Sequence, residues 1–439
     1  MNHCKSFVDQ QTIEVEMVVP PDGGWGWVIV AASFMCNLFV DGIIFSFGVF
    51  LNEIADAFSI SKARVALVGS LQTGFYLMAG PFVSALANRY GFRLVAILGS
   101  VISCIAFVLS YFSTSIEFLY VSYGAIGGIG AGLIYVPAVI TTGFYFERWR
   151  ALATGIAVCG SGIGAFLLAP ISDILIKNFG WRGALLFQAG MLLNCAIFGA
   201  MFRPLKPTRI KVKNTPENAA LEVKTALMGK GVSTTSLHCV PPNRSGFFGT
   251  NNNTEYPTAA ELFGNRAIKA NIDASTAMFL VSVIGIGNTI GRIVCGLASS
   301  LPGVNALVVN NMFISVGGLV TILSGISLTE GYQFFYAASF GLSISVFASL
   351  RSILVVDLLG LEKLTNAFGL LLLFQGVAAT VGAPLAGAFM DATGSYDASF
   401  YLSGSLILVS AVICYPLKRI NMWERRGEKN PVAMDLSAS

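Results

Sequence analysis

Three charged residues lie in the middle of long apolar stretches of the sequence: Asp41, Arg292 and Arg351. An ionisable side chain at bilayer depth costs roughly 2.5 kcal/mol or more, so such residues usually have a function. The planar guanidinium of Arg292 could hold a carboxylate through two parallel hydrogen bonds, and the Asp41 carboxylate could hold an ammonium or guanidinium group. For each of the three, a purely structural ion pair is the competing interpretation.

The elements that position these charges must be membrane helices. The chain has 439 residues, of which 55% are hydrophobic and only 11% are charged, whereas about 25% of residues are charged in soluble domains. This composition excludes a soluble protein of this size. The net charge of +4 and the short, scattered basic patches do not form a nucleic-acid-binding stripe. We therefore expect an all-α polytopic membrane protein that is surrounded by lipid and has no nucleic-acid partner.

Eleven apolar segments are long enough to cross a bilayer when the chain is scanned with a window of about 19 residues. Six lie in the first half, near 25–51, 64–87, 92–112, 117–146, 151–176 and 182–202. Five lie in the second half, near 274–300, 304–327, 332–358, 364–392 and 396–418. The polar residues between the sixth and the seventh of these segments predict a disordered loop. The expected division is a tail at 1–24, a bundle at 25–202, a loop at 203–273, a bundle at 274–418 and a tail at 419–439.

Basic residues between the segments predict the orientation, because cytoplasmic loops are enriched in Lys and Arg. Such loops follow the second, fourth and sixth segments, so we expect them and the N-terminus to be cytoplasmic. The N-terminus has no basic signal-peptide region or cleavage site, so the first segment is expected to stay as a span. The C-terminal tail is also basic, with Lys418, Arg419, Arg425, Arg426 and Lys429. A cytoplasmic tail conflicts with an odd number of spans.

The cysteines and histidines give no sign of a metal or cofactor site. Six of the eight cysteines lie in apolar stretches, none forms a C-x-x-C pair, and His3 and His238 lie in polar segments. This spacing suits neither zinc nor a disulfide framework, and the cysteines are expected to pack as small apolar side chains. We expect no metal, no cofactor and no enzymatic reaction.

The first apolar segment begins with the string D-G-G-W-G-W at residues 22–27. Asp22 is expected to cap the first turn of this helix, and the two tryptophans to lie at headgroup level. Four further strings run over Asn88–Arg93, Tyr145–Gly160, Asp357–Lys363 and Gly387–Tyr396. In this order, the five strings resemble those of the monocarboxylate transporter family, a branch of the major facilitator superfamily.

This resemblance implies a major facilitator fold of twelve helices in two bundles, with cytoplasmic termini and alternating access around a midplane site. It also implies that Asn88, Arg89 and Arg93 act at a cytoplasmic gate. Glycines spaced by four residues favour close helix packing in the first bundle, at Gly124, Gly128 and Gly132 and at Gly160 and Gly164.

The family's seventh helix is expected to be missing from this chain. Residues 246–273 carry too many charged and amide side chains to lie in lipid at a reasonable cost. Either the second half is then inverted, or the polar segment is drawn partway into the membrane. Two glycosylation sequons, at Asn243 and Asn252, would report exposure of this segment on the outer side.

Within the resemblance, the expected substrate site consists of Arg292, Asn288, Phe45 and Asp41. Proton-coupled lactate carriers of the family have an aspartate four residues before the arginine and a lysine near the end of helix one. In this sequence the two positions hold Asn288 and Phe45, which argues against proton-coupled lactate transport. Asp41 has no counterpart in that pattern and would suit a zwitterion, since some family members carry aromatic amino acids, creatine or carnitine.

We therefore expect a secondary transporter of monocarboxylates or related small carboxylates, located in the plasma membrane. The alternative is a transport-inactive sensor or interaction protein, or a truncated isoform, built on the same fold. An ion channel is disfavoured because the sequence shows no ring of like charge and no carbonyl filter. The expected partners are a carboxylate or zwitterionic solute and the lipid bilayer. The resemblance also admits a proton and a single-span accessory glycoprotein.

Overall fold

The computed structural model describes residues 12–17, 20–205, 208–213, 274–299, 304–327, 329–393 and 397–417. In the first half the helices are α1 (Trp25–Phe45), η1 (Phe47–Phe50), α2 (Leu51–Phe58), α3 (Lys62–Met78), α4 (Gly80–Tyr90), α5 (Phe92–Tyr111), α6 (Ile116–Leu119), the π-helical η2 (Tyr120–Ile126), α7 (Gly127–Tyr145) and α8 (Arg150–Ala200). In the second half they are α11 (Ala274–Ser299), α12 (Ala306–Leu323), α13 (Glu330–Leu359), η4 (Leu361–Lys363), α14 (Leu364–Thr393) and α15 (Asp397–Cys414). The two strands are β1 (Thr12–Met17) and β2 (Thr208–Lys213).

Each of the eleven apolar segments expected from the sequence contains a helix. Among the described residues, eight helices are long and apolar enough to cross a membrane, or nine if the bent pair α3 and α4 counts as one span. This count treats the 51 residues of α8 as one helix, although Gly180 has a φ of 71° and a ψ of 167°. A positive φ breaks a helix and is easy only for glycine, so α8 is two spans joined at Gly180. The bend of 43° between α3 and α4 lies at Gly80 and Pro81, because proline cannot donate to the preceding turn.

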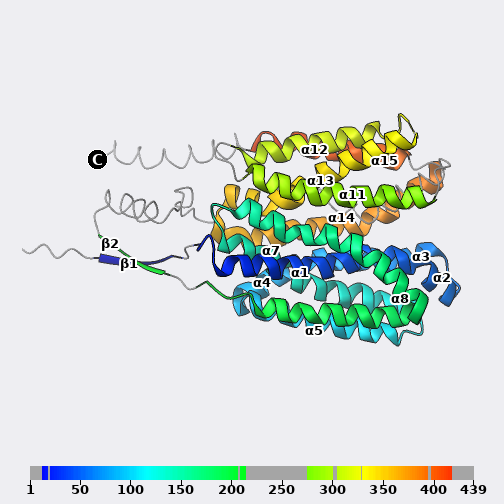
Figure 1. Cartoon of the computed structure of the whole chain (residues 1–439), viewed down its shortest axis with the longest axis horizontal. Helices are drawn as coiled ribbons and strands as arrows, with labels where there is room; N and C mark the ends of the chain where they lie inside the picture. The colour runs from blue at the N-terminus through cyan, green and yellow to red at the C-terminus, as the bar shows by residue number, and fades with distance from the viewer. Residues whose placement is uncertain are drawn as a thin grey trace, which may run out of the picture.

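The helices form two groups that lie side by side (Figure 1). Helices α1 to α8 make up the first half, and α11 to α15 make up the second half. The halves meet where α8 packs against α11 and where α14 packs against α3 and α4. The site described below lies between these two contacts.

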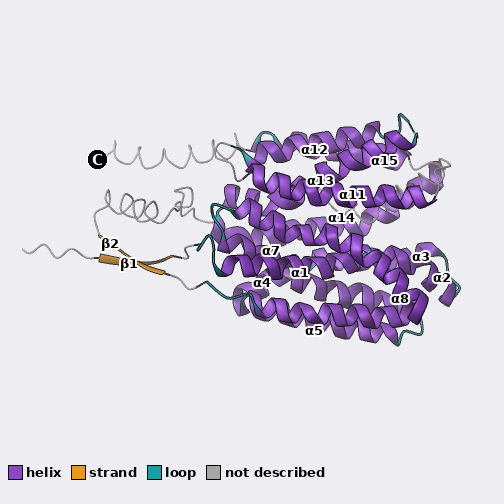
Figure 2. Ribbon diagram, in the orientation of Figure 1, coloured by secondary structure: helices purple, strands orange, loops and turns teal. Residues whose placement is uncertain are grey.

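A short ribbon of β1 and β2 extends from one end of the bundle (Figure 2). We call this end the ribbon end and the opposite end the far end. The strands are antiparallel, and their register places Glu14 opposite Lys211 and Glu16 opposite Arg209. The ribbon joins the N-terminal tail to the start of the central segment and is an addition to the expected all-helical fold.

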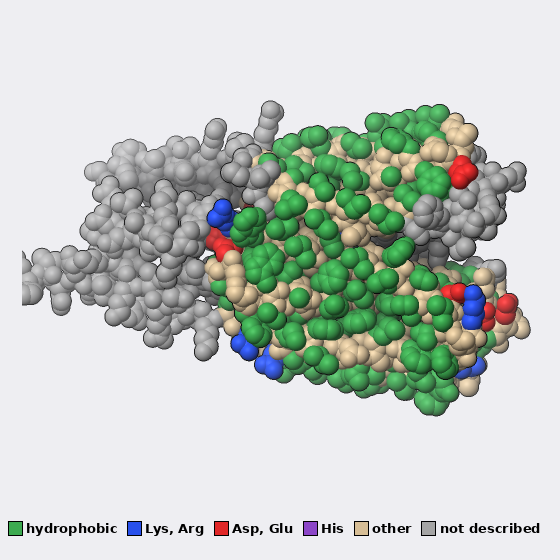
Figure 3. Space-filling model, in the orientation of Figure 1, with side chains coloured by type: hydrophobic (Ala, Val, Ile, Leu, Met, Phe, Trp, Pro, Cys, Tyr) green, Lys and Arg blue, Asp and Glu red, His purple; other side chains and the backbone are tan. Residues whose placement is uncertain are grey.

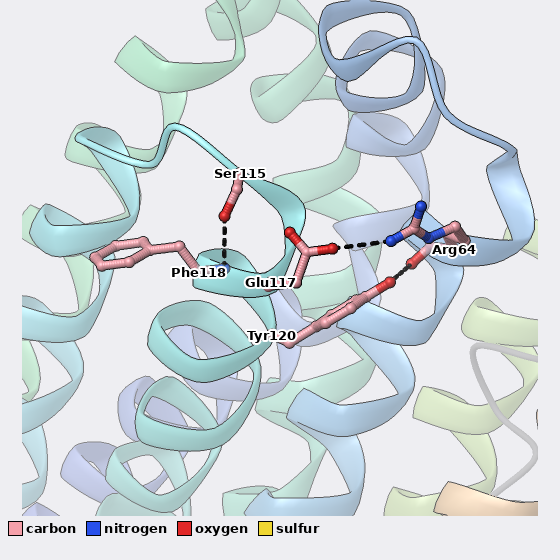
Figure 4. A network of polar contacts seen from close by, with 5 residues as sticks. All are labelled: Arg64, Ser115, Glu117, Phe118 and Tyr120. Atoms are coloured by element: carbon pink, nitrogen blue, oxygen red, sulfur yellow. Dashed lines mark hydrogen bonds and ion pairs between the residues drawn. The ribbon is translucent and has the colours of Figure 1, made fainter.

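At the far end, polar contacts join the start of α3 to the start of α6 (Figure 4). The Arg64 guanidinium contacts the Glu117 carboxylate at 2.9 Å, and the Tyr120 hydroxyl donates to the Arg64 carbonyl at 2.9 Å. Ser115 Oγ accepts from the Phe118 amide at 3.3 Å and caps α6. The ion pair is exposed, so it contributes little to stability, but the contacts fix the turn into the span formed by α6, η2 and α7.

The outer surface suits a bilayer (Figure 3). On the face shown, hydrophobic side chains cover the bundle between its ends, and the charged side chains gather at the two ends. Large apolar side chains such as Ile105, Leu193 and Val412 are exposed along the helices. A belt of this kind is stable only in contact with lipid or detergent.

The start of α1 and the end of α15 lie at the ribbon end (Figure 1). Helix α11 runs opposite to the first part of α8, since a Cβ on Gly155 would lie 2.9 Å from the Arg292 carbonyl and one on Gly296 would lie 2.9 Å from the Ala151 carbonyl. Ala274 is therefore at the far end, whereas Tyr145 holds Arg203 at the ribbon end through a hydrogen bond of 2.9 Å.

Of the two expected consequences of a missing helix, inversion of the second half does not occur in this arrangement. Residues 214–273, where the seventh helix is expected to be missing, lie outside the described residues, as do the two sequons and the tail after residue 417.

Candidate functional site

A cavity of about 100 Å³ lies between the two halves. Its walls come from α1, α3, α7 and α8 of the first half and from α11, α13 and α14 of the second. All four expected substrate-site residues line it, together with Arg351: Asp41, Phe45, Asn288, Arg292 and Arg351. Residues far apart in the sequence therefore meet around one space.

Arg292 on α11 is 8% exposed and reaches across to the first half. Its Nη1 donates to the Val158 carbonyl and to Ser161 Oγ on α8. This reach requires α8 and α11 to lie very close, and glycine permits it: a Cβ on Gly162 would lie only 2.4 Å from Thr289 Oγ1. These two contacts fix the guanidinium at the wall of the cavity, where its planar fork suits a carboxylate.

Asp41 on α1 is 5% exposed. Its Oδ1 accepts a hydrogen bond of 2.7 Å from the Tyr76 hydroxyl on α3. Helix α1 comes close to α8 here, since a Cβ on Gly42 would lie 2.8 Å from the carbonyl carbon of Gly164. The expectation that Gly164 serves close helix packing is confirmed, and this packing brings Asp41 and Arg292 to the same cavity.

Asn288 and Phe45 occupy the positions where the resemblance places an acid and a lysine. Asn288 is 1% exposed and lines the cavity one turn before Arg292. Its Oδ1 has no hydrogen-bond partner among the described residues, so it can accept from a solute. Phe45 presents an aromatic ring to the same cavity. Among the described residues that line the cavity, Asp41 is the sole acid.

Arg351 on α13 is the second cation of the cavity and is 7% exposed. Its Nη1 donates to Gln375 Oε1 on α14 at 3.2 Å. The guanidinium carbon lies 5.4 Å from the ring centroid of Tyr135 and 5.1 Å from that of Phe368, within the range of a cation–π contact. No ion pair within 4.0 Å is found for Arg351 among the described residues, so the structural ion pair considered for it is not formed with any of them.

Sequence reasoning did not find the uncharged partners of these groups. Tyr76, Tyr135, Ser161 and Gln375 line the cavity, but single polar side chains in apolar helices are common. A signal was available for Gln375, because a buried amide is rare in a run as apolar as Leu370–Phe374.

The expected gate residues lie at the ribbon end, where α4 meets α5. The Asn88 side chain donates to Asn366 Oδ1 on α14 at 2.7 Å and so crosses between the halves. The Arg89 guanidinium instead lies 5.4 Å from the ring centroid of its neighbour Tyr90. Arg93 is exposed. Among the three, Asn88 alone has a described contact with the opposite half.

Asp22 does not cap α1, contrary to expectation, because α1 has no side-chain cap. Its Oδ1 accepts from the amides of Glu147 at 2.7 Å and Arg148 at 3.1 Å. The Gly23–Gly24 turn, with a φ of 56° at Gly24, directs the carboxylate to the connection between α7 and α8. The family-like strings at residues 22–27 and Tyr145–Gly160 thus meet in space, and Asp22 satisfies backbone donors that follow α7.

Comparison with known proteins agrees with this geometry. A profile of the Major Facilitator Superfamily matches residues 30–237 and 245–434. Human monocarboxylate transporter 11 is 31% identical, over 91% of this chain and 84% of its own length. Rat monocarboxylate transporter 13 is also 31% identical, over 92% of this chain and 91% of its own. This chain belongs to the monocarboxylate transporter family.

The fold of this family member is also found among solved structures. The proton:xylose symporter XylE, solved with 6-bromo-6-deoxy-D-glucose, matches with a TM-score of 0.62 over 89% of this chain and 95% of that chain. The sequence identity of 12% limits this likeness to the fold. The expected family and fold class are confirmed: this is a multi-pass membrane protein of a family of transporters, not of enzymes.

Proposed function

We propose that this protein carries small monocarboxylates across the membrane by alternating access, with the carboxylate held by Arg292. The observation that carries the proposal is the position of Arg292: it is buried, lines a cavity between the two halves and contacts both of them. A solute bound there is shared by the two halves, as alternating access requires. The guanidinium fork matches a carboxylate better than an ammonium group would.

The same arrangement supports a proposal for the orientation. The ribbon end carries Arg89, Arg148 and Arg203, and basic loops favour the cytoplasm. We propose a cytoplasmic N-terminus and a plasma-membrane location. The Asn88–Asn366 contact then closes the cytoplasmic side.

A zwitterionic solute is the second candidate. Asp41 lines the same cavity as the arginines and could hold an ammonium group while Arg292 holds the carboxylate. Loss of zwitterion uptake with retained monocarboxylate uptake in Asp41→Asn would support this use of Asp41.

Counterflow in proteoliposomes tests the proposal. Proteoliposomes that contain the purified protein are loaded with unlabelled solute. The labelled solute is then offered outside, in separate experiments with acetate, pyruvate, L-lactate, phenylalanine, creatine and carnitine. We expect Arg292→Lys to lower uptake at least tenfold, because the charge stays but the bidentate fork is lost. Arg64→Lys, at an exposed position far from the cavity, is the matched control.

Wild-type protein that binds these solutes but gives no counterflow would indicate a sensor and not a carrier. Full uptake by a folded Arg292→Ala variant would show that Arg292 does not hold the substrate carboxylate. Purification from the native membrane would show whether a single-span glycoprotein accompanies the carrier.

A further inference from the structure

Arg93 and Arg203 are exposed at the ribbon end, and neither has a role in the function proposed above. Arg93 was expected at a gate, but it has no described contact with the opposite half. Among the described residues, neither arginine forms an ion pair within 4.0 Å. The two cations can therefore attract an anion from the surroundings of the protein.

The two arginines lie at the same rim of one helix pair, which consists of α5 and the second part of α8. At the far end, Arg182 Nη2 donates to the Ser113 carbonyl at 2.9 Å, so the end of α5 meets the start of this second part. Toward the ribbon end, a Cβ on Gly199 would lie 2.9 Å from Ala96 Cβ. The helices are thus antiparallel. Both arginines follow this crossing on its ribbon side within four residues, roughly 5–6 Å along the helix axes.

Arg203 is held in place by aromatic side chains and not by an acid. Its guanidinium carbon lies 3.8 Å from the ring centroid of Trp25 on α1, which is a cation–π distance. Trp25 Nε1 donates to the Met201 carbonyl at 3.2 Å, and the Tyr145 hydroxyl donates to the Arg203 carbonyl at 2.9 Å. Stacking covers a flat face of the guanidinium, so its charge and its N–H edge stay suited to an anion.

This rim is where the apolar belt meets the lipid headgroups. Trp25 and Tyr90 are 39% and 54% exposed, and exposed aromatic side chains of this kind lie at headgroup level. Just inside the rim, the apolar side chains of Leu94 and Leu98 on α5 and Ile197 on α8 are exposed. On the face shown in Figure 3, basic side chains lie at the ribbon end beside the hydrophobic surface. Cationic groups thus adjoin an apolar strip, which matches the two parts of a phospholipid.

We propose that Arg93 and Arg203 bind the headgroup of an anionic phospholipid of the cytoplasmic leaflet, whose acyl chains lie along Leu94, Leu98 and Ile197. The arginine fork pairs with a phosphate through two hydrogen bonds, and anionic lipids are concentrated in that leaflet. Phosphatidylcholine has no net charge and does not balance the two cations. The site uses the orientation proposed above, but it lies on the outer surface and not in the cavity.

Native mass spectrometry of the purified full chain in detergent tests this site. Phosphatidylinositol 4,5-bisphosphate, phosphatidylserine and phosphatidylcholine with the same acyl chains are titrated separately, and the fraction of protein with one bound lipid gives an apparent Kd. Both anionic lipids should bind roughly tenfold more tightly than phosphatidylcholine, or better. Inositol 1,4,5-trisphosphate, which has no acyl chains, should bind roughly tenfold more weakly than the bisphosphate lipid, or worse.

Removal of either charge should weaken the binding of anionic lipid. Arg93→Gln and Arg203→Gln are each expected to raise the Kd about fivefold, and the double variant about twenty-five-fold, since one basic residue near an anionic surface contributes a factor of this size. Arg182→Gln is the matched control. Arg182 also stacks on a tryptophan, with 4.4 Å to the ring centroid of Trp181, but it lies at the far end. Its substitution should leave the Kd unchanged.

The outcomes decide the site without any transport measurement, so a failure of the carrier function is seen separately. An unchanged Kd in the double variant would overturn the site, and so would an equal loss in Arg182→Gln, which would show a general effect of charge. Inositol trisphosphate binding as tight as that of the lipid would replace the lipid with a soluble phosphate. If Arg203→Gln does not fold, Arg93→Gln decides, because Arg93 has no described hydrogen bond or ion pair to lose: a weaker Kd supports the site and an unchanged one overturns it.

Discussion

The Asn88 side chain on α4 and the Asn366 side chain on α14 join the two halves at the ribbon end through a hydrogen bond of 2.7 Å. The helices cross closely just inside this contact, since a Cβ on Gly80 would lie 2.6 Å from the Gly369 carbonyl. Farther along α14, a Cβ on Gly382 would meet no described residue within 4 Å. The halves are therefore closely packed between the cavity and the ribbon end.

Loss of this hydrogen bond should favour opening at the ribbon end. Asn88→Ala removes a contact worth about 1 kcal/mol, so the open population should increase roughly fivefold. Spin labels on α4 and α14 would measure the change as a longer interhelical distance. Arg89→Ala is the control, because Arg89 contacts its own neighbour. A larger effect from Arg89→Ala would mean that the arginines, and not Asn88, hold the gate.

The glycine crossing between α4 and α14 should not tolerate a methyl group. A Cβ on Gly369 would lie 2.3 Å from Ser84 Oγ and 2.8 Å from the Gly80 carbonyl, and such overpacking costs about 1–3 kcal/mol. Gly369→Ala is expected to lower counterflow at least tenfold by preventing closure at the ribbon end. Gly382→Ala on the same helix should transport normally. Equal activity of the two variants would show that this crossing does not form during transport.

Asp22 should stabilise the connection between α7 and α8. Asp22→Ala leaves the amides of Glu147 and Arg148 without their acceptor, at a cost of about 1–3 kcal/mol. The thermal unfolding midpoint in detergent is expected to fall, and less so for Asp22→Asn, which keeps an oxygen acceptor. The exposed Asp56 supplies the control variant, Asp56→Ala. No difference between Asp22→Ala and Asp56→Ala would contradict this role.

Transport should depend only weakly on an inward proton gradient. Asn288 cannot take up a proton, and Asp41 is the sole acid among the described residues of the cavity. Uptake measured at two external pH values, with the membrane potential clamped, should differ less than threefold. Strong stimulation at acid pH that persists in Asp41→Asn would place the proton site at a residue outside this cavity.

Both ends of the chain should lie on one side of the membrane. The start of α1 and the end of α15 are at the ribbon end (Figure 1), so epitope tags at the two termini should be protected from protease together in sealed vesicles. The described residues on either side of the central segment, Leu205 and Ala274, lie toward opposite ends of the bundle. Glycosylation at Asn243 or Asn252 would show that this part of the chain reaches the outer side. Tags on opposite sides would contradict the arrangement of the second half.

The sequence by itself determined the spans and the all-helical class, because hydropathy is a local property and every span must satisfy it. The family came from the resemblance of five short strings and not from hydropathy. Hydropathy also predicted the break near Gly180, since a polar interruption separates two apolar runs there. Arg292 and Asp41 were identifiable as site residues because a charge in an apolar helix needs a function or a partner.

The tertiary structure decided which side chains meet. Helix rotation and close packing at Gly42 and Gly162 place Asp41 and Arg292 around one cavity. The packing of α13 brings Arg351 to that cavity, and the packing of α4 against α14 joins Asn88 to Asn366. Asp22 caps the connection after α7 and not its own helix, because a glycine turn redirects it. These contacts depend on how whole helices pack together, and no local pattern of the sequence encodes that.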